Sequence, residues 1–269
     1  QYPYKIIGAN IDDPMSGYFL SFPATHKFGV SFQRVLSPIA QKVFFCKLNN
    51  SNEPLEFEVQ DQIYQLNMLG VFNTKNAALA VAAAENFGVN LAKSSKALLS
   101  FTGVLGRMQR VSNNLNMEII IDYGCEPATI KSALEAAAQI PHNRLIHVFG
   151  STGGHRDVSK RFDFGKTSAQ FADEIIITND DVYNSSPEEI AKNIEEGINS
   201  FNKRKPNYQI ILDRRTAISK ALFIAKKGAV VLITGKGSEQ FLVLPGNKRI
   251  KWDEVSVVKE ELRSINQEL

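Results

Sequence analysis

The stretch Val148-Phe-Gly-Ser-Thr-Gly-Gly-His-Arg-Asp-Val-Ser-Lys-Arg161 decides the fold that we expect for this chain. It begins as the end of an apolar strand, continues as a glycine-rich polar turn and ends as the start of a basic helix. A strand–turn–helix unit of this kind brings backbone amides and cations to an anion. We therefore expect an anion-binding loop within an alternating arrangement of strands and helices.

The sequence on both sides of this loop alternates in the same way. Strands are expected at residues 117–121, 144–149, 174–178, 208–212 and 229–233, and helices at 127–140, 158–172, 186–198, 214–227 and 253–265. Several of these strands are continuous apolar runs, as in parallel sheets that helices cover on both faces. The sequence therefore predicts an α/β fold whose C-terminal part is a Rossmann-like, doubly wound, mostly parallel sheet.

The first hundred residues have a different pattern. Short strands are expected at 4–11, 18–22, 42–48 and 55–59, arranged as an antiparallel meander, and helices at 77–87 and 94–101; residues 25–38 give no clear assignment. Asn76, at the expected helix start, either caps the helix or faces a ligand. Gly103 and Gly106 indicate a domain boundary near residue 105, so the expected units are residues 1–105 and 106–269.

Composition excludes several classes of function. The net charge is only +3 and the basic residues are scattered, so we expect no nucleic-acid partner. No apolar run approaches the roughly 20 residues that span a bilayer, and the first residues lack a signal-peptide pattern, so we expect a cytoplasmic protein with no membrane partner. Cys46 and Cys125 are far apart and the histidines lack metal spacing, which indicates neither a disulfide framework nor a metal site.

Polar residues follow four of the predicted strands, at 122–123, 150–160, 178–181 and 234–239. The carboxyl ends of parallel strands meet at one edge of the sheet, where ligands of such folds bind. Arg156 offers a fork for a carboxylate and Lys160 a point charge, unless the turn simply carries solvated charges. Asp180 and Asp181 require a nearby cation, amine or solvent; we expect one to cap the loop and the other to bind an ammonium group.

Two glycine–lysine pairs imitate a phosphate-binding loop. Gly165-Lys166-Thr167 and Gly235-Lys236-Gly237 both lack the required leading glycine, and no stretch of the 269 residues supplies G-x-x-x-x-G-K-[ST]. We expect Gly165 to lie inside a helix, and His147, within a strand, to be structural.

In combination, the motifs of this chain resemble those of the Mur ligases. The resemblance covers roughly residues 1–260 and rests on Gly70-x-Phe72-Asn73-x-x-Asn76, Gly106-Arg107, Asp122-Tyr123, the glycine loop with Arg156 and Lys160, Asp180-Asp181, Asp213-Arg214 and Gly235-Lys236-Gly237-x-Glu239. It is strongest to the branch that extends UDP-MurNAc-dipeptide. It implies that residues 1–105 are the remainder of the central ATPase domain and that 106–269 form the C-terminal domain.

The resemblance also implies a reaction and a set of site residues. Enzymes of this family use ATP to phosphorylate the terminal carboxylate of a UDP-muropeptide, and the amine of the added amino acid then attacks the acyl phosphate. The residues implied to contact nucleotide are Asn76, Arg107, Asp122 and Lys160. Those implied to hold the amino acid are Arg156, which pairs with its carboxylate, and Asp180, Asp181, Gly235 and Glu239.

The chain departs from the family pattern at several positions. It has Asp122-Tyr123-Gly124-Cys125 for Asp-Tyr-Ala-His and Gly237-Ser238-Glu239 for Gly-His-Glu. Asp180-Asp181-Val182-Tyr183 stands where diaminopimelate-adding members have Asp-Asn-Pro-Arg. Loss of that arginine favours lysine or another simple diamine over diaminopimelate, although both stay open.

The expected P-loop, the magnesium ligands and the UDP-binding domain would precede residue 1, and the sequence does not begin with Met. We therefore expect a fragment that alone neither hydrolyses ATP nor ligates. The complete enzyme is expected to use ATP and Mg²⁺, and no residue of this chain is expected to be catalytic. Two alternatives stay open: a non-catalytic binding module derived from a Mur ligase, and a related amide ligase such as folylpolyglutamate synthase or cyanophycin synthetase.

Overall fold

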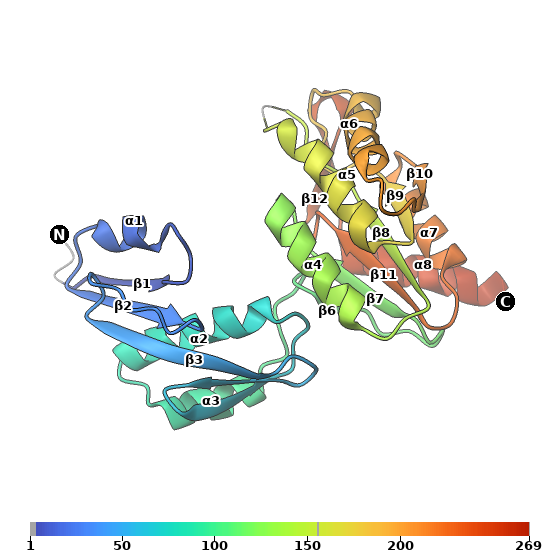
Figure 1. Cartoon of the computed structure of the whole chain (residues 1–269). Helices are drawn as coiled ribbons and strands as arrows, with labels where there is room; N and C mark the ends of the chain where they lie inside the picture. The colour runs from blue at the N-terminus through green and yellow to red at the C-terminus, as the bar shows by residue number, and fades with distance from the viewer. Residues whose placement is uncertain (1–3, 155, 269) are drawn as a thin grey trace. The chain divides into compact units, whose positions relative to one another are not determined.

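The computed structural model describes residues 4–154 and 156–268, and it divides between Gly103 and Val104 into two compact units (Figure 1). Each unit has its own sheet and its own buried apolar cluster. In the described part of the chain, no helix has the length and apolar character needed to cross a membrane.

Residues 4–103 of the first unit form a five-stranded mixed sheet with three helices. Its elements are β1 (Ile6–Asn10), α1 (Ser16–Ser21), β2 (His26–Ser31), β3 (Lys42–Asn50), β4 (Leu55–Val59), β5 (Gln62–Leu66), α2 (Phe72–Asn86) and α3 (Leu91–Leu99). The order is β1-β2-β3-β4-β5, in which β1, β2 and β3 are parallel and only β3, β4 and β5 form an antiparallel meander. The predicted meander is therefore wrong for the first half of the sheet.

The connection between β1 and β2 explains this error. Parallel neighbours need a crossover rather than a tight hairpin, and α1 provides it where the sequence predicts a strand at 18–22. Asp13 starts the turn before α1, because its carboxylate accepts the Met15 amide at 2.8 Å. The previously unassigned stretch 25–38 contains β2.

Helix α2 begins earlier than the sequence predicts, at Phe72, and this changes the position of Asn76. Asn76 lies in the second turn, exposed, and donates to Asn73 Oδ1 at 3.2 Å, so the prediction that it caps the helix is wrong. Helix α3 also begins earlier than expected: its cap is Asn90, whose side chain accepts the Lys93 amide at 2.8 Å.

The second unit is the predicted doubly wound sheet. Its elements are β6 (Gln109–Arg110), β7 (Glu118–Asp122), α4 (Pro127–Gln139), β8 (Arg144–Phe149), α5 (Ser159–Phe171), β9 (Glu174–Ile177), α6 (Pro187–Ser200), β10 (Asn207–Ile210), α7 (Arg214–Ile224), β11 (Ala229–Thr234), β12 (Phe241–Leu244), a 3₁₀ turn (Pro245–Asn247), β13 (Lys248–Lys251) and α8 (Glu254–Glu268). The sheet order is β10-β9-β8-β11-β7-β6, parallel except for β6. The α/β prediction is confirmed.

Helices cover both faces of this sheet: α4, α5 and α6 lie along one face, and α7 and α8 along the other (Figure 1). Val231 and Ile233 of β11 pack with Ile218 and Leu222 of α7 and with Val258 of α8. Burial on both faces accounts for the uninterrupted apolar runs that identify these strands in the sequence.

Two further expectations concern the interior of this unit. Gly165 lies inside α5, where a side chain would collide with the Ile194 carbonyl of α6, so this glycine serves helix packing. His147 is fully buried in β8, between Ser168 Oγ at 2.8 Å and Thr234 Oγ1 at 3.0 Å. Burial lowers the pKa of His147 to about 3, so the ring is neutral and structural.

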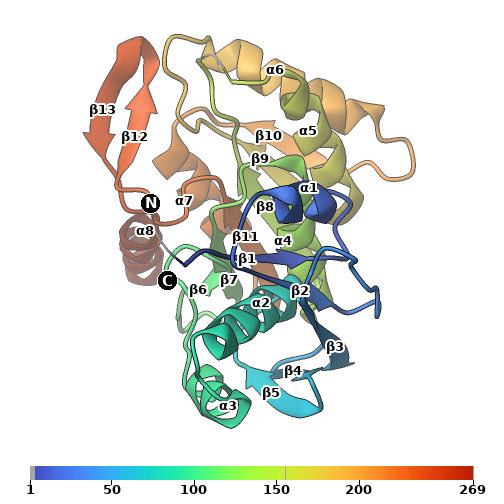
Figure 2. The same ribbon diagram turned by 90° about the vertical axis from the view of Figure 1, so that its left-hand side faces the viewer.

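The hairpin of β12 and β13 is absent from the sequence-based prediction. Figure 2 shows it as a separate two-stranded ribbon beside the main sheet. It is tied to the sheet through the Val182 amide, which donates to the Val243 carbonyl at 2.9 Å. This contact places one face of the hairpin beside the loop that follows β9.

Candidate functional site

The loops after β7, β8, β9 and β11 meet at one pocket, as the sheet topology requires. The pocket has a volume of about 200 Å³. Six of the nine residues singled out in the sequence line it: Arg156, Lys160, Asp180, Asp181, Gly235 and Glu239. These include all five residues that the family pattern implies for an amino acid.

The acidic residues of this pocket surround a lysine of the same chain. Lys236 Nζ lies 2.8 Å from Asp181 Oδ1 and 3.8 Å from Asp180 Oδ1, and it forms an ion pair with Glu239 Oε2. The lysine side chain is fully buried. Burial by itself lowers the pKa of Lys236, but Asp180 and the hydrogen bonds to Asp181 and Glu239 outweigh it and raise the pKa above its usual value. Lys236 is therefore charged.

Asp180 and Asp181 divide their roles as the sequence indicates. Asp180 Oδ1 accepts the Asp181 amide at 2.7 Å and caps the loop, while Asp181 binds an ammonium group, which belongs to Lys236. Burial raises the pKa of Asp180, opposed by Arg214 and Lys236. Sequence analysis missed Lys236 as a site residue, although the Gly-Lys-Gly turn after a buried strand places it there.

Arg214, the first residue of α7, lies next to the pocket residue Gly235. Its buried guanidinium pairs with Glu254 and donates to the carbonyls of Asn179 at 3.2 Å and Thr234 at 3.0 Å. Asn179 lies in the loop after β9 and Thr234 is the last residue of β11, so one side chain holds together the carboxyl ends of two strands. Arg214 belongs to the family pattern in the sequence, but local pattern alone indicates no role for it.

Position 235 requires glycine because of its backbone conformation and because the Asp180 side chain lies close to it. Its φ is +116°, a conformation that favours glycine, and a side chain there would press against Asp180 Oδ2. The glycine thus allows the loop after β11 to approach the loop after β9 closely enough for Lys236 to reach both aspartates.

The glycine loop after β8 differs from the amide cradle that its composition predicts. The Gly153 amide donates to the Asp181 carbonyl at 2.7 Å and the Gly154 amide to Ser185 Oγ at 2.9 Å, so these two amides are unavailable to an anion. Side chains at Gly150 and Gly153 would collide with the Thr178 and Val182 carbonyls. The glycines therefore serve to pack this loop against residues 178–185.

The cations of the loop are its remaining means of binding an anion. Arg156 is exposed, and no carboxylate within the described ranges lies at ion-pair distance from it. Lys160 Nζ is 2.6 Å from Glu126 Oε1, on the rim of the same pocket. Arg156 is thus the cation that is free to receive a ligand carboxylate.

The residues implied for nucleotide binding are less closely grouped. Asp122 is buried and its carboxylate accepts two backbone amides, from Met108 at 2.9 Å and from Gly124 at 2.7 Å. The Arg107 guanidinium lies 4.5 Å from the centre of the Tyr123 ring, whose hydroxyl donates to Glu239 Oε1 at 3.0 Å. This hydrogen bond and burial raise the pKa of Tyr123. Asn76 belongs to the first unit.

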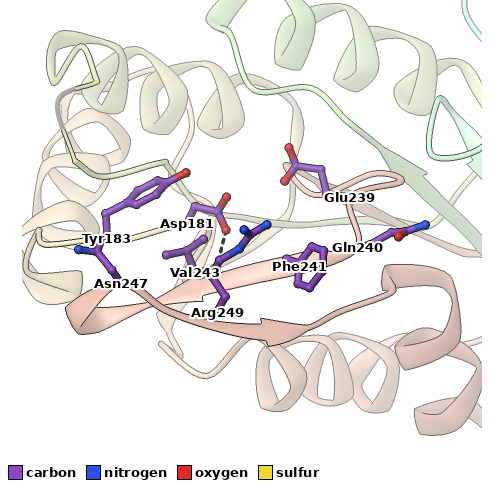
Figure 3. A pocket seen from close by; sticks show the side chains of 8 residues that line it. All are labelled: Asp181, Tyr183, Glu239, Gln240, Phe241, Val243, Asn247 and Arg249. Carbon is purple, nitrogen blue, oxygen red and sulfur yellow. Dashed lines mark hydrogen bonds between the residues drawn. The ribbon is translucent and has the colours of Figure 1, made fainter.

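A second, open cleft of about 640 Å³ adjoins the pocket (Figure 3). Asp181, Tyr183 and Glu239 line both, and the hairpin contributes Phe241 and Arg249 to the cleft alone. Sequence analysis did not identify this region. In the described part of the chain, no three His, Cys, Asp or Glu side chains are grouped so as to hold a metal ion.

Residues 106–237 match the sequence model of the Mur ligase, glutamate ligase domain. The chain is 36% identical over 203 residues to the UDP-N-acetylmuramoyl-L-alanyl-D-glutamate–2,6-diaminopimelate ligase 1 of Clostridium acetobutylicum. The alignment covers 75% of this chain and 41% of that protein. The chain belongs to the Mur ligase family.

Solved Mur ligases have the same fold. A UDP-N-acetylmuramoyl-L-alanyl-D-glutamate–2,6-diaminopimelate ligase aligns with a TM-score of 0.58 and 26% identity, over 97% of this chain and 54% of the other. MurF of Thermotoga maritima, solved in complex with ADP, aligns with a TM-score of 0.59 and 18% identity, over 91% and 55%. The chain spans less than half the length of two curated relatives that it matches, 41% of one and 44% of the other. Mur ligases are ATP-dependent ligases.

Proposed function

We propose that this chain is the amino-acid-binding part of an ATP-dependent ligase of peptidoglycan precursor synthesis, which adds a diamino acid to UDP-MurNAc-dipeptide. The observation that carries the proposal is the pocket in which an unpaired arginine, Arg156, faces the acidic groups Asp181 and Glu239. A free amino acid is a zwitterion, and this pocket offers a partner of opposite charge to each of its ends.

The charge of the pocket wall favours an additional ammonium group. Two buried cations, Lys236 and Arg214, contact the carboxylates of Asp180, Asp181, Glu239 and Glu254. The acids that line the pocket are Glu126, Asp157, Asp180, Asp181 and Glu239, against the lining cations Arg156 and Lys160 and the buried Lys236. Five acids against three cations leave an excess of negative charge, and an excess remains even when Asp180 is protonated. Glu239, whose side chain is 39% exposed, is the acid best placed to meet an incoming amine.

The reaction itself requires activation and positioning. A carboxylate is a poor electrophile, so ATP first converts the terminal carboxylate of the muropeptide to an acyl phosphate, and the bound amine then displaces phosphate. The contribution proposed for this chain is to hold the amine in place, which makes its attack effectively intramolecular. Since the reaction consumes ATP, we also propose that it takes place in the cytoplasm.

The nucleotide contacts proposed for the second unit come from Lys160 and Arg107. Asn76 is a separate candidate in the first unit. Lys160 at the pocket rim can leave Glu126 for a phosphate oxygen, because the pair is partly exposed and therefore weak. For Asp122 we propose a positioning role, since its carboxylate holds the backbone at Met108 and Gly124. We propose no step through Mg²⁺ for the residues of this chain.

Calorimetric titration of the chain with L-lysine and with 2,6-diaminopimelate tests the proposal. We expect at least one of them to bind, and Arg156→Ala to weaken that binding about tenfold or more, because a charge-assisted hydrogen bond is lost. Lys192→Ala, on the exposed side of α6, is the control and leaves binding unchanged. Failure of both ligands to bind, or full binding by Arg156→Ala, would contradict the proposal.

A further inference from the structure

The cleft beside the pocket contains a second arginine without an acidic partner. Arg249 of β13 lines the cleft together with Asp181, Tyr183 and Glu239, and in Figure 3 its side chain extends toward the same space as theirs. None of the described carboxylates lies at ion-pair distance from Arg249. Its guanidinium is therefore free to meet an anion.

The hairpin fixes where Arg249 lies. Arg249 pairs with Val243 across the antiparallel ladder, so their side chains share one face of the hairpin. The Val243 amide donates to Asp181 Oδ1 at 2.8 Å, which ties this face to the acidic residues of the pocket. The Arg249 guanidinium also lies 4.4 Å from the centre of the Phe241 ring, a cation–π contact that limits its movement.

Tyr183 stands where the pocket and the cleft join. It lines both, and its φ of +51° is unusual for a bulky residue. Its carbonyl accepts the Gly246 amide at 3.1 Å, so the turn of the hairpin holds this conformation. The pocket and the cleft thus share Asp181, Tyr183 and Glu239, while Arg156 lines the pocket and Arg249 lines the cleft.

We propose that this cleft binds the distal carboxylate of a diamino dicarboxylic acid, with Arg249 as the residue that selects it; the inference rests on the proposed function. A ligand such as 2,6-diaminopimelate carries a carboxylate at each end and amines between them. The order of charges around the site, cation, acids, cation, matches this molecule. Lysine has no second carboxylate and leaves Arg249 without a partner.

Arg249→Gln, compared with Lys248→Gln, tests this specificity by calorimetry on the whole chain. Lys248 is an exposed cation on the same strand, pairs with Leu244 and lies on the opposite face. We expect Arg249→Gln to weaken binding of 2,6-diaminopimelate about tenfold or more and to leave binding of L-lysine unchanged. Lys248→Gln changes neither.

The outcomes separate this inference from the proposed function. If Arg156→Ala weakens binding but Arg249→Gln binds 2,6-diaminopimelate as well as the parent chain does, the specificity role is wrong and the proposed function stands. An equal loss for lysine and diaminopimelate in Arg249→Gln also overturns it, because that loss would report general damage. If the parent chain binds neither ligand, both proposals fail.

Discussion

The ammonium of Lys236 lies 2.8 Å from Asp181 Oδ1, and this contact joins the loop after β11 to the loop after β9. The lysine is buried and contacts three carboxylates, so it neutralises part of their negative charge before an amine ligand binds. The pocket is consequently built before any ligand enters, with its acids already oriented.

Replacing Lys236 by Met should therefore destabilise the second unit strongly. Removing one partner of a buried ion pair leaves uncompensated charge, at a cost of about 3–5 kcal/mol. Trp252, the only tryptophan, is buried in this unit, so its fluorescence during urea unfolding reports the change. Lys192→Met is the control, and a loss for Lys236→Met below about 1 kcal/mol would show that the cluster is not a structural unit.

A comparison of Gly235→Ala with Gly246→Ala separates the cost of close packing from the cost of backbone conformation. Gly246 also has a positive φ, +74°, but no atom lies within 4 Å of the place its side chain would occupy, whereas at Gly235 that place is against Asp180. We expect both alanine variants to lower the free energy of unfolding, by about 1 kcal/mol for Gly246→Ala and by more for Gly235→Ala. Equal losses would exclude the contact with Asp180 as the reason for this glycine.

The buried His147 makes the stability of the second unit sensitive to acid. Its pKa is lowered from 6.5 to about 3, so below pH 6.5 the unfolded chain takes up a proton that the folded chain does not. Stability is then lost as the pH falls, by up to about 1.4 kcal/mol per pH unit between these values. We expect the free energy of unfolding of His147→Gln to fall less steeply than that of the parent between pH 7 and 5; identical slopes would contradict the assignment.

Cys125 offers a readout of pocket occupancy that is independent of heat measurements. It lines the pocket, and burial together with Glu126 and Asp180 raises the pKa of its thiol. We expect slow alkylation at neutral pH, slowed further by a bound diamino acid, because the thiolate is the reactive form. Cys46 is buried with a pKa of about 12 and should be protected throughout. Alkylation of Cys125 at the same rate with saturating ligand would contradict binding in this pocket.

The part of the fold that the sequence predicts well is the part specified by local pattern. Apolar runs separated by capped helices identify the doubly wound sheet, and the rule that ligands bind at strand ends then brings the four polar loops together. Ser186, for example, caps α6 by accepting the Glu189 amide at 3.2 Å, as its sequence context indicates.

The features that were missed depend on contacts between distant segments. The aromatic run at Tyr18–Phe22 has the composition of a strand, yet it forms α1 because β1 and β2 are parallel and need a crossover. The reach of Lys236 to three acids depends on how closely two loops approach. The hairpin that carries Arg249 does have a turn sequence, Pro245-Gly246, but its place beside the loop after β9 depends on the contact between Val182 and Val243. Local pattern contains none of this information.

A crystal structure of the chain with whichever of L-lysine and 2,6-diaminopimelate binds it in the titration tests most directly whether this pocket receives the incoming amino acid. We predict one carboxylate on the guanidinium of Arg156, an amine within hydrogen-bond distance of Glu239 or Asp181, and the Lys236 contacts unchanged. A ligand bound elsewhere on the chain, or no bound ligand at a saturating concentration, would contradict the proposed function.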